Sequence, residues 1–486
     1  MTVLTMAAIP DAPSRAPAGR GWRGAAAVAR ILAIPGGLAL LVAVAWGSMF
    51  GGGLVSDDWV WLERARTGAV LEMGLFFRPA CWCSWWAQAA MDPRWIHLGD
   101  LLLHWLCAWQ LARLVTALCG SRAAGGAVAA CFSTLPALHE AVCWSSARCG
   151  PLAAACVCAA MAGVTAGRRT LLAIPLIAVA MASQEAAVGL SWGLPLLLAA
   201  RGRGRDAARW AAVLAVITAG YMAALEATGS HQRLSGGYTA PFSLPRLLAH
   251  LGAYLGLALG REGTSGWWPL WPALGLAAAW AGVRRRRWTA VALWAWASIT
   301  MFPLVRLGGP EQPRFLYVMV LPVLTAAGCG ISLLRGRAFR GAVGIVAALG
   351  LVMTPQARSA CRDWLTSGAR VAPIVARAVG AVSPGRPVIV VNVPEWEGNA
   401  HLLRNGLFPA MRLSSGLPFV GLTIPPSQSV ESCGQLLAWL ALNAPPYAED
   451  ASVGAWMFVG DDLRKLTGWR DAAHADLPLA AMRDKR

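Results

Sequence analysis

Acidic and basic side chains recur where the long apolar segments of this sequence end. Asp57 and Asp58 follow the first apolar segment, and Arg78 lies later in the same loop. Three further loops carry the other members of the set: His139, Glu140 and Arg148, then Ser183, Gln184 and Glu185, and finally Arg306, Glu311 and Arg314. A carboxylate can take the proton of a hydroxyl group, and an arginine can bind a phosphate through two parallel hydrogen bonds. Such a set could activate an acceptor hydroxyl and neutralise a phosphate leaving group.

Each of these residues also has a purely structural explanation. Asp57 and Asp58 could cap a helix that begins near Trp59. Glu140 and Arg148 could form an ordinary loop ion pair, and Arg314 could extend from a helix end to the membrane surface. Ionisable side chains at membrane level are costly, however, and this set falls on one predicted side of the membrane. The placement of all these residues on one predicted side of the membrane favours a functional site over the structural explanations.

Composition identifies the chain as an integral membrane protein. Of the 486 residues, 57% are hydrophobic and only 14% are charged, whereas a soluble domain has about 25% charged residues. Apolar stretches recur between positions 28 and 353, each near the ~20 residues that cross a bilayer. The net charge of +18 would suggest nucleic-acid binding in a soluble protein. Here the arginines stand in short tracts between apolar segments, so we exclude nucleic acid as a partner.

The arginine tracts predict the orientation of the chain in a bacterial-type inner membrane, because Lys and Arg concentrate in cytoplasmic loops. The N-terminus is then cytoplasmic, and so are the tracts at Arg122, Arg168 and Arg169, 201–205, 284–287, and Arg335 and Arg337. Between consecutive tracts the chain must cross the membrane an even number of times. Ser183, Gln184 and Glu185 therefore form an outward turn between two short spans. The segment 245–260 becomes an outer-leaflet or re-entrant helix.

These rules predict an all-α polytopic membrane protein with a small α/β domain outside the membrane. We expect about eleven spans, near 31–50, 98–118, 124–141, 151–167, 171–183, 187–200, 210–227, 269–283, 289–305, 315–334 and 340–354. The expected parts are a cytoplasmic tail (1–27), a transmembrane domain (28–354) and an extracytoplasmic α/β domain (355–486). A β-branched run at 387–393 predicts a buried strand in the last part. The tryptophan-rich loop 51–96 predicts helices that lie in the membrane interface.

One helix face carries further polar residues. His97, Asp100 and His104 are spaced i, i+3 and i+7, which places them on one side of a helix. A metal site is conceivable there, but a hydrogen-bonded polar stripe between packed helices is the favoured interpretation. The twelve cysteines have no zinc-binding spacing.

Taken in order, these residues resemble the motifs of a known family. The sequence resembles the GT-C membrane glycosyltransferases, above all the membrane part of tetratricopeptide-containing protein O-mannosyltransferases and their bacterial relatives. The matching segments, within roughly residues 40–335, are Asp57-Asp58, Arg78-Pro79, His97-Leu-Gly-Asp100-Leu-Leu-Leu-His104, Leu135-Pro136-Ala-Leu138-His139-Glu140-Ala-Val142-Cys-Trp144-Ser-Ser-Ala-Arg148, Ser183-Gln184-Glu185 and Pro313-Arg314-Phe-Leu-Tyr317. Each motif is weak alone, and the ordered set is more specific.

The sequence departs from the family pattern at several of these positions. Leu135 and Leu138 stand where the family has histidines, and His139 is shifted by one place. Gln184 replaces a lysine, Asp100 replaces an asparagine, and Glu311 is displaced. No tetratricopeptide array follows the membrane part. Because of these departures, the substrate and the strength of the activity can differ from those of the family.

The resemblance implies transfer of a sugar from a polyprenyl-phosphate donor to an acceptor hydroxyl at the outer face of the membrane. The acceptor would be a protein, a glycan or a lipid. The resemblance further implies that Asp57 or Asp58 is the general base, with inversion at the sugar. The expected substrate-binding residues are Arg78, Arg148 and Arg314 for the phosphate, Glu140 and Glu185 for donor or acceptor, and His97, His139 and Glu311. Family members that use lipid monophosphate sugars generally need no metal, so we expect neither a metal nor a cofactor.

The alternative function is that of a transporter or lipid-handling protein without covalent chemistry. Transporters often show internal repeats and broken helices near the middle of the membrane. The sequence has no such repeat, and its ionisable residues gather outside rather than at the midplane. The transferase is therefore the favoured interpretation.

Overall fold

The computed structural model describes residues 20–69, 77–167, 170–229, 243–258, 269, 273–277, 279–280, 288–305, 312–473 and 475–482. Several predicted features lie outside these ranges. They are most of the tail 1–27, the tracts at Arg168 and Arg169 and at 284–287, and the candidate site residues Arg306 and Glu311.

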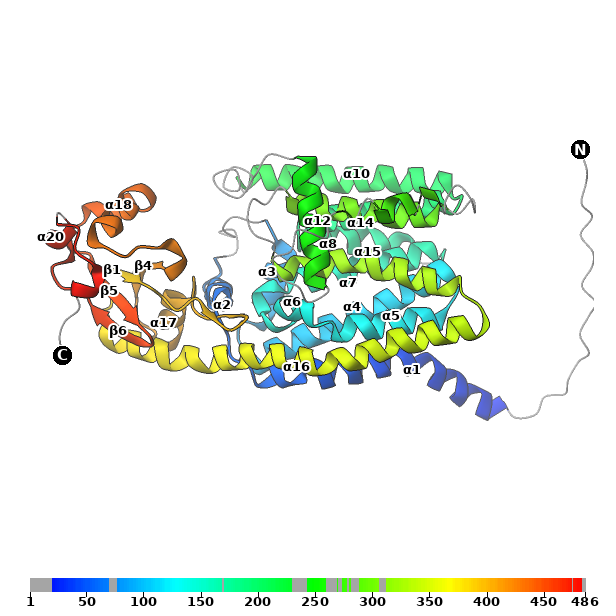
Figure 1. The fold of residues 1–486 in the computed structure, drawn as a ribbon, viewed down its shortest axis with the longest axis horizontal. Helices are drawn as coiled ribbons and strands as arrows, with labels where there is room; N and C mark the ends of the chain where they lie inside the picture. Colours follow the sequence, from blue (N-terminus) through cyan, green and yellow to red (C-terminus); the bar gives the residue numbers. More distant parts are fainter. Residues whose placement is uncertain are drawn as a thin grey trace, which may run out of the picture.

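Helices form most of the molecule, and many of the longer ones lie side by side (Figure 1). In chain order they are α1 (Arg20–Trp46), α2 (Asp57–Thr67), α3 (Pro79–Gln88), α4 (Pro93–Cys119), α5 (Arg122–Thr134), α6 (His139–Cys143), α7 (Cys149–Thr165), α8 (Thr170–Met181), α9 (Ala186–Ala200), α10 (Gly204–Ala227), α12 (Leu244–Ala258), α14 (Thr289–Val305), α15 (Pro313–Ser332) and α16 (Gly336–Ala381). One continuous apolar core runs between them, with Leu111, Phe132 and Tyr317 among its fully buried members. Short 3-10 turns at Gly47–Gly51, Pro136–Leu138 and Ser145–Ala147 connect helices near one end of the bundle.

The bundle contains the helices that a membrane protein needs. Within the described residues, six stretches are long and apolar enough to cross a bilayer: Ala33–Gly51, Pro93–Cys119, Ser145–Thr165, Gly204–Ala227, Pro313–Ser332 and part of Gly336–Ala381. A seventh candidate is the pair Arg122–Thr134 and Pro136–Cys143, which is bent by 61°. Three shorter apolar helices accompany them, at Leu171–Met181, Ala186–Ala200 and Thr289–Met301. The predicted multi-pass helical membrane protein is confirmed, while seven of the fifteen residues of the predicted span 269–283 lie outside the described residues.

The helix α12 runs across the bundle rather than along it (Figure 1). It packs against α14 and α15, with Leu251 and Tyr254 buried. Its crosswise direction agrees with the prediction of a helix at 245–260 that does not span the membrane.

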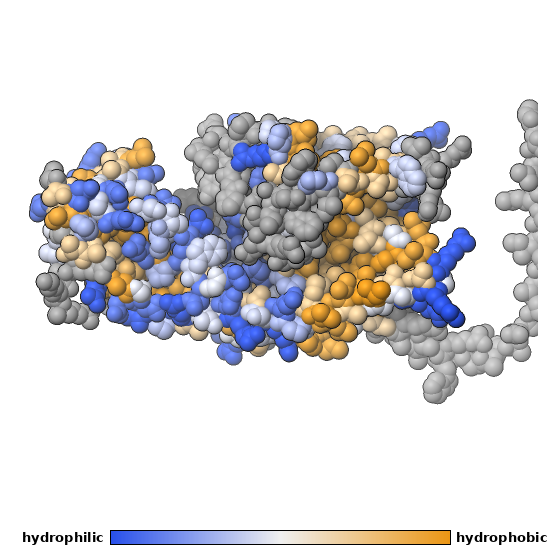
Figure 2. Space-filling view, in the orientation of Figure 1, coloured by the Kyte–Doolittle hydropathy of each residue, from blue (hydrophilic) through white to orange (hydrophobic). Residues whose placement is uncertain are grey.

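The surface of the molecule divides into an apolar part and a polar part (Figure 2). Along α16, Ile345, Leu351 and Val352 are exposed apolar side chains. They are followed by exposed Arg358 and Arg362. The chemistry of the helix surface therefore changes close to Pro355, where we predicted the end of the transmembrane domain.

The helix α16 does not break at that predicted boundary. It continues to Ala381 as a single helix of 46 residues, with Pro355 and Pro373 inside it. A proline removes one backbone hydrogen bond and often kinks a helix, yet here the helix passes through both. The C-terminal part is therefore joined to the bundle by a helix and not by a flexible linker.

The C-terminal part is the small α/β unit that the sequence predicts. Its four-stranded sheet has the order β4 (Val420–Ile424), β1 (Pro387–Val391), β5 (Gly454–Val459), β6 (Asp462–Lys465). Strand β1, the predicted β-branched run, is parallel to β4 and β5, and β6 is antiparallel to β5. Ile389 and Val391 are buried against Leu436 and Leu440 of α18 (Cys433–Asn443). The remaining helices are α17 (Leu407–Ser415), α19 (Pro445–Glu449) and α20 (Trp469–Ala473).

A separate two-stranded hairpin lies between this sheet and the bundle. It consists of β2 (Trp396–Glu397) and β3 (Ala400–His401), which pair antiparallel. The hairpin packs on α16. It carries two residues, His401 on β3 and Asn405 shortly after it, that become important at the site.

Candidate functional site

Asp58 is completely buried where the first span turns into α2. The non-glycine residue Ser56 adopts a φ of 46° at this turn, and α2 begins immediately after it. One carboxylate oxygen, Oδ2, accepts a hydrogen bond from Val55 N at 3.1 Å. The other, Oδ1, accepts from Ser146 N at 2.7 Å and from Ser146 Oγ at 2.6 Å. Asp58 thus connects the segment after the first span to the turn that precedes α7.

Burial raises the pKa of the Asp58 carboxyl to about 7. Removal from water disfavours the charged form, and the hydrogen bonds from Ser146 and Val55 offset only part of that effect. The carboxyl group therefore changes its protonation state near neutral pH.

Asp57 is only partly buried, and a residue of the C-terminal part holds it. Its Oδ1 accepts a hydrogen bond from Asn405 Nδ2 at 2.9 Å. The neighbouring Ser56 N donates to Leu402 O at 2.6 Å. The residue at the helix cap is Ser56, and its side chain makes no capping hydrogen bond. Helix capping therefore does not account for the pair, because Asp58 binds Ser146 and Asp57 binds Asn405.

Glu140 joins three parts of the chain. Its carboxylate accepts hydrogen bonds from Arg314 N and Arg314 Nη1, both at 2.9 Å. His401 Nε2 lies 3.2 Å from Glu140 Oε1. The side chain of Arg314 is 25% exposed, against 6% for Glu140, and its guanidinium lies over the ring of Trp144 at 5.1 Å. Glu140 is therefore the buried member of the pair, and Arg314 is the member that a ligand can reach.

Arg148 is a second arginine of the set, and it lies deep in the protein. Its side chain is 2% exposed and pairs with Asp100, with Nη2 2.9 Å from Oδ1. The guanidinium also donates to Gln88 and to Ser145 O, and it stacks over Trp85 at 4.5 Å. The predicted alternative, an ion pair between Glu140 and Arg148, is not formed, because each residue pairs with a different partner.

Arg78 and Glu185 form the third ion pair. Arg78 Nε and Nη2 donate to the two carboxylate oxygens of Glu185 at 3.0 and 2.7 Å. The two side chains are 12% and 16% exposed. Glu185 lies in the turn between α8 and α9, as the parity of the spans predicts.

The side chain of Arg78 and the backbone of Arg314 both lie close to the N-terminus of α7. A side-chain atom placed on Gly150, in the first turn of α7, would lie 3.4 Å from Gln184 Oε1 and 3.8 Å from Arg314 O. Arg78 Nη1 lies 3.6 Å from Cys149 Sγ in the same turn. A helix N-terminus carries a partial positive charge. Two arginines and a helix N-terminus therefore converge here, which suits an anionic ligand.

The histidines of the set are hydrogen-bonded, and two of them, His97 and His104, are buried. His97 lies near Gly53 O at 3.4 Å and Ser145 Oγ at 3.4 Å. His104 contacts Tyr317 Oη at 2.9 Å and Ser133 O at 3.1 Å, so the polar stripe of α4 binds neighbouring helices. His139 Nδ1 accepts from Trp364 Nε1 at 3.1 Å. Within the described residues, no three His, Cys, Asp or Glu side chains gather as a metal site requires.

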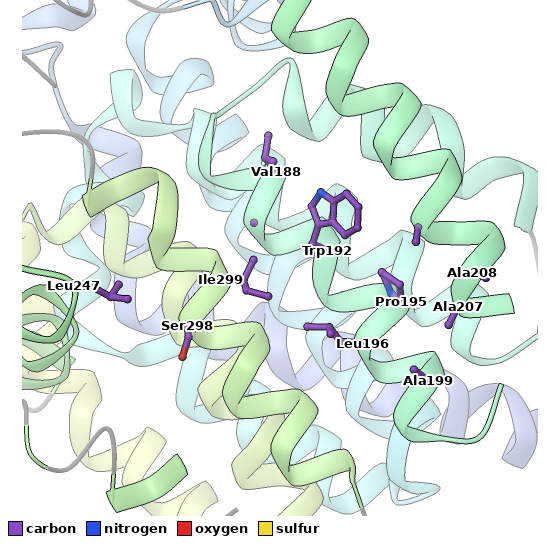
Figure 3. Close-up of a pocket in the computed structure, with 12 residues that line it drawn as sticks. Val188, Trp192, Pro195, Leu196, Ala199, Ala207, Ala208, Leu247, Ser298 and Ile299 are labelled. Carbon is purple, nitrogen blue, oxygen red and sulfur yellow. The ribbon is translucent and has the colours of Figure 1, made fainter. Parts of the chain in front are cut away.

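An apolar groove of about 760 Å³ opens between α9, α10 and α14 (Figure 3). Val188 and Trp192 line one stretch of it, and Ala199 and Ala208 line another. The groove wall is almost entirely hydrocarbon, with Ser298 as its one hydroxyl-bearing side chain. Val188 stands three positions after Glu185, so one end of the groove begins near the Arg78–Glu185 pair.

Two residues that contact the site were absent from the sequence-based set. His401 and Asn405 come from the C-terminal part, far along the chain from Glu140 and Asp57. No spacing rule connects such distant positions, and the resemblance ends near residue 335. The folded hairpin brings them to the site.

Comparison with known sequences returned no relative, whereas comparison with solved structures did. No family model and no curated protein sequence matches the chain. The structure of ArnT from Cupriavidus metallidurans bound to undecaprenyl phosphate superimposes with a TM-score of 0.54 at 15% identity, over 88% of this chain and 93% of ArnT. ArnT in the apo state gives a TM-score of 0.53 at 14% identity, over 89% and 93%. The chain has the GT-C membrane glycosyltransferase fold.

The GT-C likeness extends beyond the region in which the sequence motifs lie. The matched 88% of the chain is more than residues 28–354 alone would supply, so it includes much of the C-terminal part. The GT-C fold of this protein thus comprises the helical bundle together with residues beyond it.

Proposed function

We propose that this chain is a membrane glycosyltransferase that moves a sugar from a polyprenyl-phosphate donor to an acceptor hydroxyl. The proposal rests on one arrangement above all. Partly buried Asp57 and the Glu140–Arg314 pair contact the same short segment of the C-terminal part, through Asn405 and His401. A candidate base and a candidate phosphate-binding cation are therefore held by one structural element. The GT-C fold supports the same reaction class.

Asp57 is the proposed general base, because it is the more accessible carboxylate of the pair. It would take the proton of the acceptor hydroxyl while the hydroxyl oxygen attacks the anomeric carbon of the donor sugar. The bond from that carbon to the phosphate oxygen breaks, and polyprenyl phosphate leaves. Attack from the face opposite the phosphate inverts the configuration. Buried Asp58 would hold the loop in place through Ser146 rather than touch the substrate.

The proposed phosphate-binding cations are Arg314 and Arg78. Within the described chain, the Arg314 guanidinium donates one side-chain hydrogen bond, to Glu140, which leaves other N–H groups for phosphate oxygens. Arg78 and the N-terminus of α7 would add positive potential beside it. Arg148 is fully enclosed with Asp100, so we assign it to holding the turn before α7 and not to the phosphate.

The polyprenyl chain would lie in the apolar groove between α9, α10 and α14. The groove begins near the Arg78–Glu185 pair, and its hydrocarbon wall matches an isoprenoid chain. The neighbour ArnT was solved with undecaprenyl phosphate, which motivates that lipid as the probe. The acceptor is a hydroxyl of a protein, a glycan or a lipid.

For the orientation, we propose a bacterial-type inner membrane with the N-terminus cytoplasmic and the site and C-terminal part outside. The exposed surface of α16 supports an exit from the membrane near Pro355. Arg201 and Arg203 follow α9 at the end opposite Glu185, where a cytoplasmic loop is expected. Residues 1–27, 28–354 and 355–486 would then be the cytoplasmic, transmembrane and extracytoplasmic parts.

The experiment that tests the function uses full-length protein in lipid nanodiscs with a panel of undecaprenyl-phosphate monosaccharides. We expect release of undecaprenyl phosphate together with transfer of one sugar to a native envelope extract, and loss of both in Asp57→Asn. Binding of the lipid without any turnover across the panel would favour a lipid-handling protein instead.

A further inference from the structure

The hairpin β2–β3 and the four residues after it reach both halves of the proposed site. Asn405 Nδ2 donates to Asp57 Oδ1 at 2.9 Å, and His401 Nε2 lies 3.2 Å from Glu140 Oε1. Between them, Leu402 O accepts from Ser56 N at 2.6 Å. One short stretch of the C-terminal part therefore contacts the candidate base and the carboxylate that holds Arg314.

The extension of α16 fixes this stretch in position. Ser367 Oγ donates to His401 O, and Arg370 forms an ion pair with Glu397. Asp363 Oδ2 accepts from Asn399 N and Nδ2, both at 3.2 Å. These contacts come from the part of α16 beyond Pro355, so the unbroken helix holds the hairpin against the site.

The approach to the first outer loop is close enough to require a glycine. A side-chain atom on Gly406 would lie 2.1 Å from Ser56 O, so no larger residue fits without moving the backbone. The contact between the C-terminal stretch and the turn at Asp57 is thus part of the packed structure.

We propose that His401 and Asn405 are positioning residues of this transferase: Asn405 orients the Asp57 carboxylate, and His401 holds Glu140 so that Glu140 holds Arg314. This inference rests on the proposed function and adds a role for the C-terminal part. Neither residue touches the reacting atoms.

The surroundings of His401 suit that role. Its side chain is 3% exposed, and its ring packs against Trp144 at 4.4 Å and Trp396 at 4.0 Å. The carboxylate of Glu140 can only accept, so Nε2 carries the hydrogen in this contact. Nδ1 is buried with no hydrogen-bond partner within the described residues. The ring is therefore packed between two tryptophans, and within the described residues the hydrogen bond of its side chain is to Glu140.

Substitutions of His401 and Asn405 should change different parameters. Loss of His401 should raise the dissociation constant for the lipid, and loss of Asn405 should lower kcat. His401→Phe keeps an aromatic ring between Trp144 and Trp396 and removes the donor to Glu140. Because a hydrogen bond to a charged group is lost, the dissociation constant for undecaprenyl phosphate should rise about 10-fold. His401→Gln, which retains an N–H donor, should recover most of that affinity. Asn405→Ala should leave the affinity unchanged and lower kcat between about 10- and 100-fold, because the base is no longer aligned.

A matched control lies on the same hairpin. Asn399→Ala also removes an asparagine–aspartate hydrogen bond, to Asp363, but it contacts neither Asp57 nor Glu140. The backbone N–H at position 399 and the contacts of Ser367 and Arg370 still hold the hairpin in this variant. Its affinity and kcat should therefore both equal those of the wild type. A merely structural role of the hairpin would instead lower the active fraction in all the variants alike, without raising the dissociation constant.

The test uses full-length protein in nanodiscs, with undecaprenyl phosphate as the binding probe and the undecaprenyl-phosphate monosaccharide panel for kcat. A raised dissociation constant in His401→Phe, a lowered kcat in Asn405→Ala and partial rescue of affinity by His401→Gln would establish the inference. If the wild type transfers sugar and both variants match Asn399→Ala, the inference is overturned while the proposed function stands. If the wild type transfers no sugar, the proposed function fails and the inference fails with it.

Discussion

Arg148 Nη2 lies 2.9 Å from Asp100 Oδ1, with both side chains almost wholly buried. The same arginine was part of the sequence-based phosphate-binding set, and Asp100 is the residue that replaces the family's asparagine. The ionic partner on α4 gives Arg148 a structural role within the site wall. The burial of Arg148 also distinguishes it from Arg314, whose side chain is 25% exposed.

Removal of one member of this buried pair should destabilise the protein strongly. Arg148→Ala leaves the Asp100 charge without its partner, and such a loss typically costs about 3–5 kcal/mol. A large drop in the unfolding temperature of the detergent-solubilised protein would reveal it. Arg94→Ala, which breaks the exposed pair with Asp92, is the control and should not shift that temperature. Equal unfolding temperatures of the two variants would show that the buried pair contributes little to stability.

The exposed arginine should behave differently from a membrane-anchoring one. Arg314→Lys keeps the charge but loses the planar fork that binds phosphate oxygens through two hydrogen bonds, so undecaprenyl phosphate should bind about 10-fold more weakly. Arg335→Lys, at an exposed position before α16, should leave the affinity unchanged, since any long cation reaches the head groups. The dissociation constants in nanodiscs decide the question. Unchanged binding in Arg314→Lys would remove this residue from the phosphate site.

The rate of transfer should depend on pH through Asp58. Burial raises its pKa to about 7, so the group is protonated below that pH and ionised above it. The ionised carboxylate can accept both hydrogen bonds from Ser146, so kcat/KM should rise as the pH increases through about 7. Asp58→Asn should lack this rise. An identical pH profile in wild type and variant would assign the titration to another group.

The same pKa shift has a consequence for stability with the opposite dependence on pH. The folded protein holds the Asp58 proton more tightly than the unfolded chain, whose carboxyl has a pKa of about 3.8. The contribution of Asp58 to the free energy of unfolding is therefore full below about pH 4 and is lost as the pH rises toward 7. Between about pH 4 and 7 the melting temperature of the wild type should therefore fall relative to that of Asp58→Asn, because the asparagine does not titrate.

The groove between α9, α10 and α14 should select for the length of the lipid. Ala211→Trp fills the groove and should weaken binding of undecaprenyl phosphate about 10-fold, while a phosphate carrying two isoprene units should bind as before. Val216→Trp, on the same helix at a site that is 73% exposed, is the matched control. Equal effects on long and short lipids, or none on either, would place the lipid elsewhere.

The sequence predicted more of the membrane part than of the site's contacts. Long apolar segments and arginine tracts follow local rules, so the multi-pass fold, the crosswise helix at 245–260 and the turn at Glu185 could be foreseen. The β-branched run that became β1 was recognisable for the same reason. The continuity of α16 could not be predicted, because two prolines and a change in composition at Pro355 resemble a domain boundary.

The pairing of the charged residues depends on tertiary structure that the sequence does not display. Glu140 and Arg148 are close in sequence, yet they bind Arg314 and Asp100 respectively. His401 and Asn405 reach the site through the long α16 and a hairpin of two-residue strands. Contacts between positions several hundred residues apart follow no periodicity, which is why the sequence-based set lacked both residues.

The most direct test of the account compares wild type with Asp57→Asn in one transfer reaction. The substitution keeps the shape of the side chain and a hydrogen-bonding partner for Asn405, but it removes the base. With an undecaprenyl-phosphate monosaccharide that the wild type uses, Asp57→Asn should bind undecaprenyl phosphate normally and transfer the sugar about 10²–10⁴-fold more slowly. Transfer by Asp57→Asn at the wild-type rate would contradict the account, because Asp57 would then not be the base.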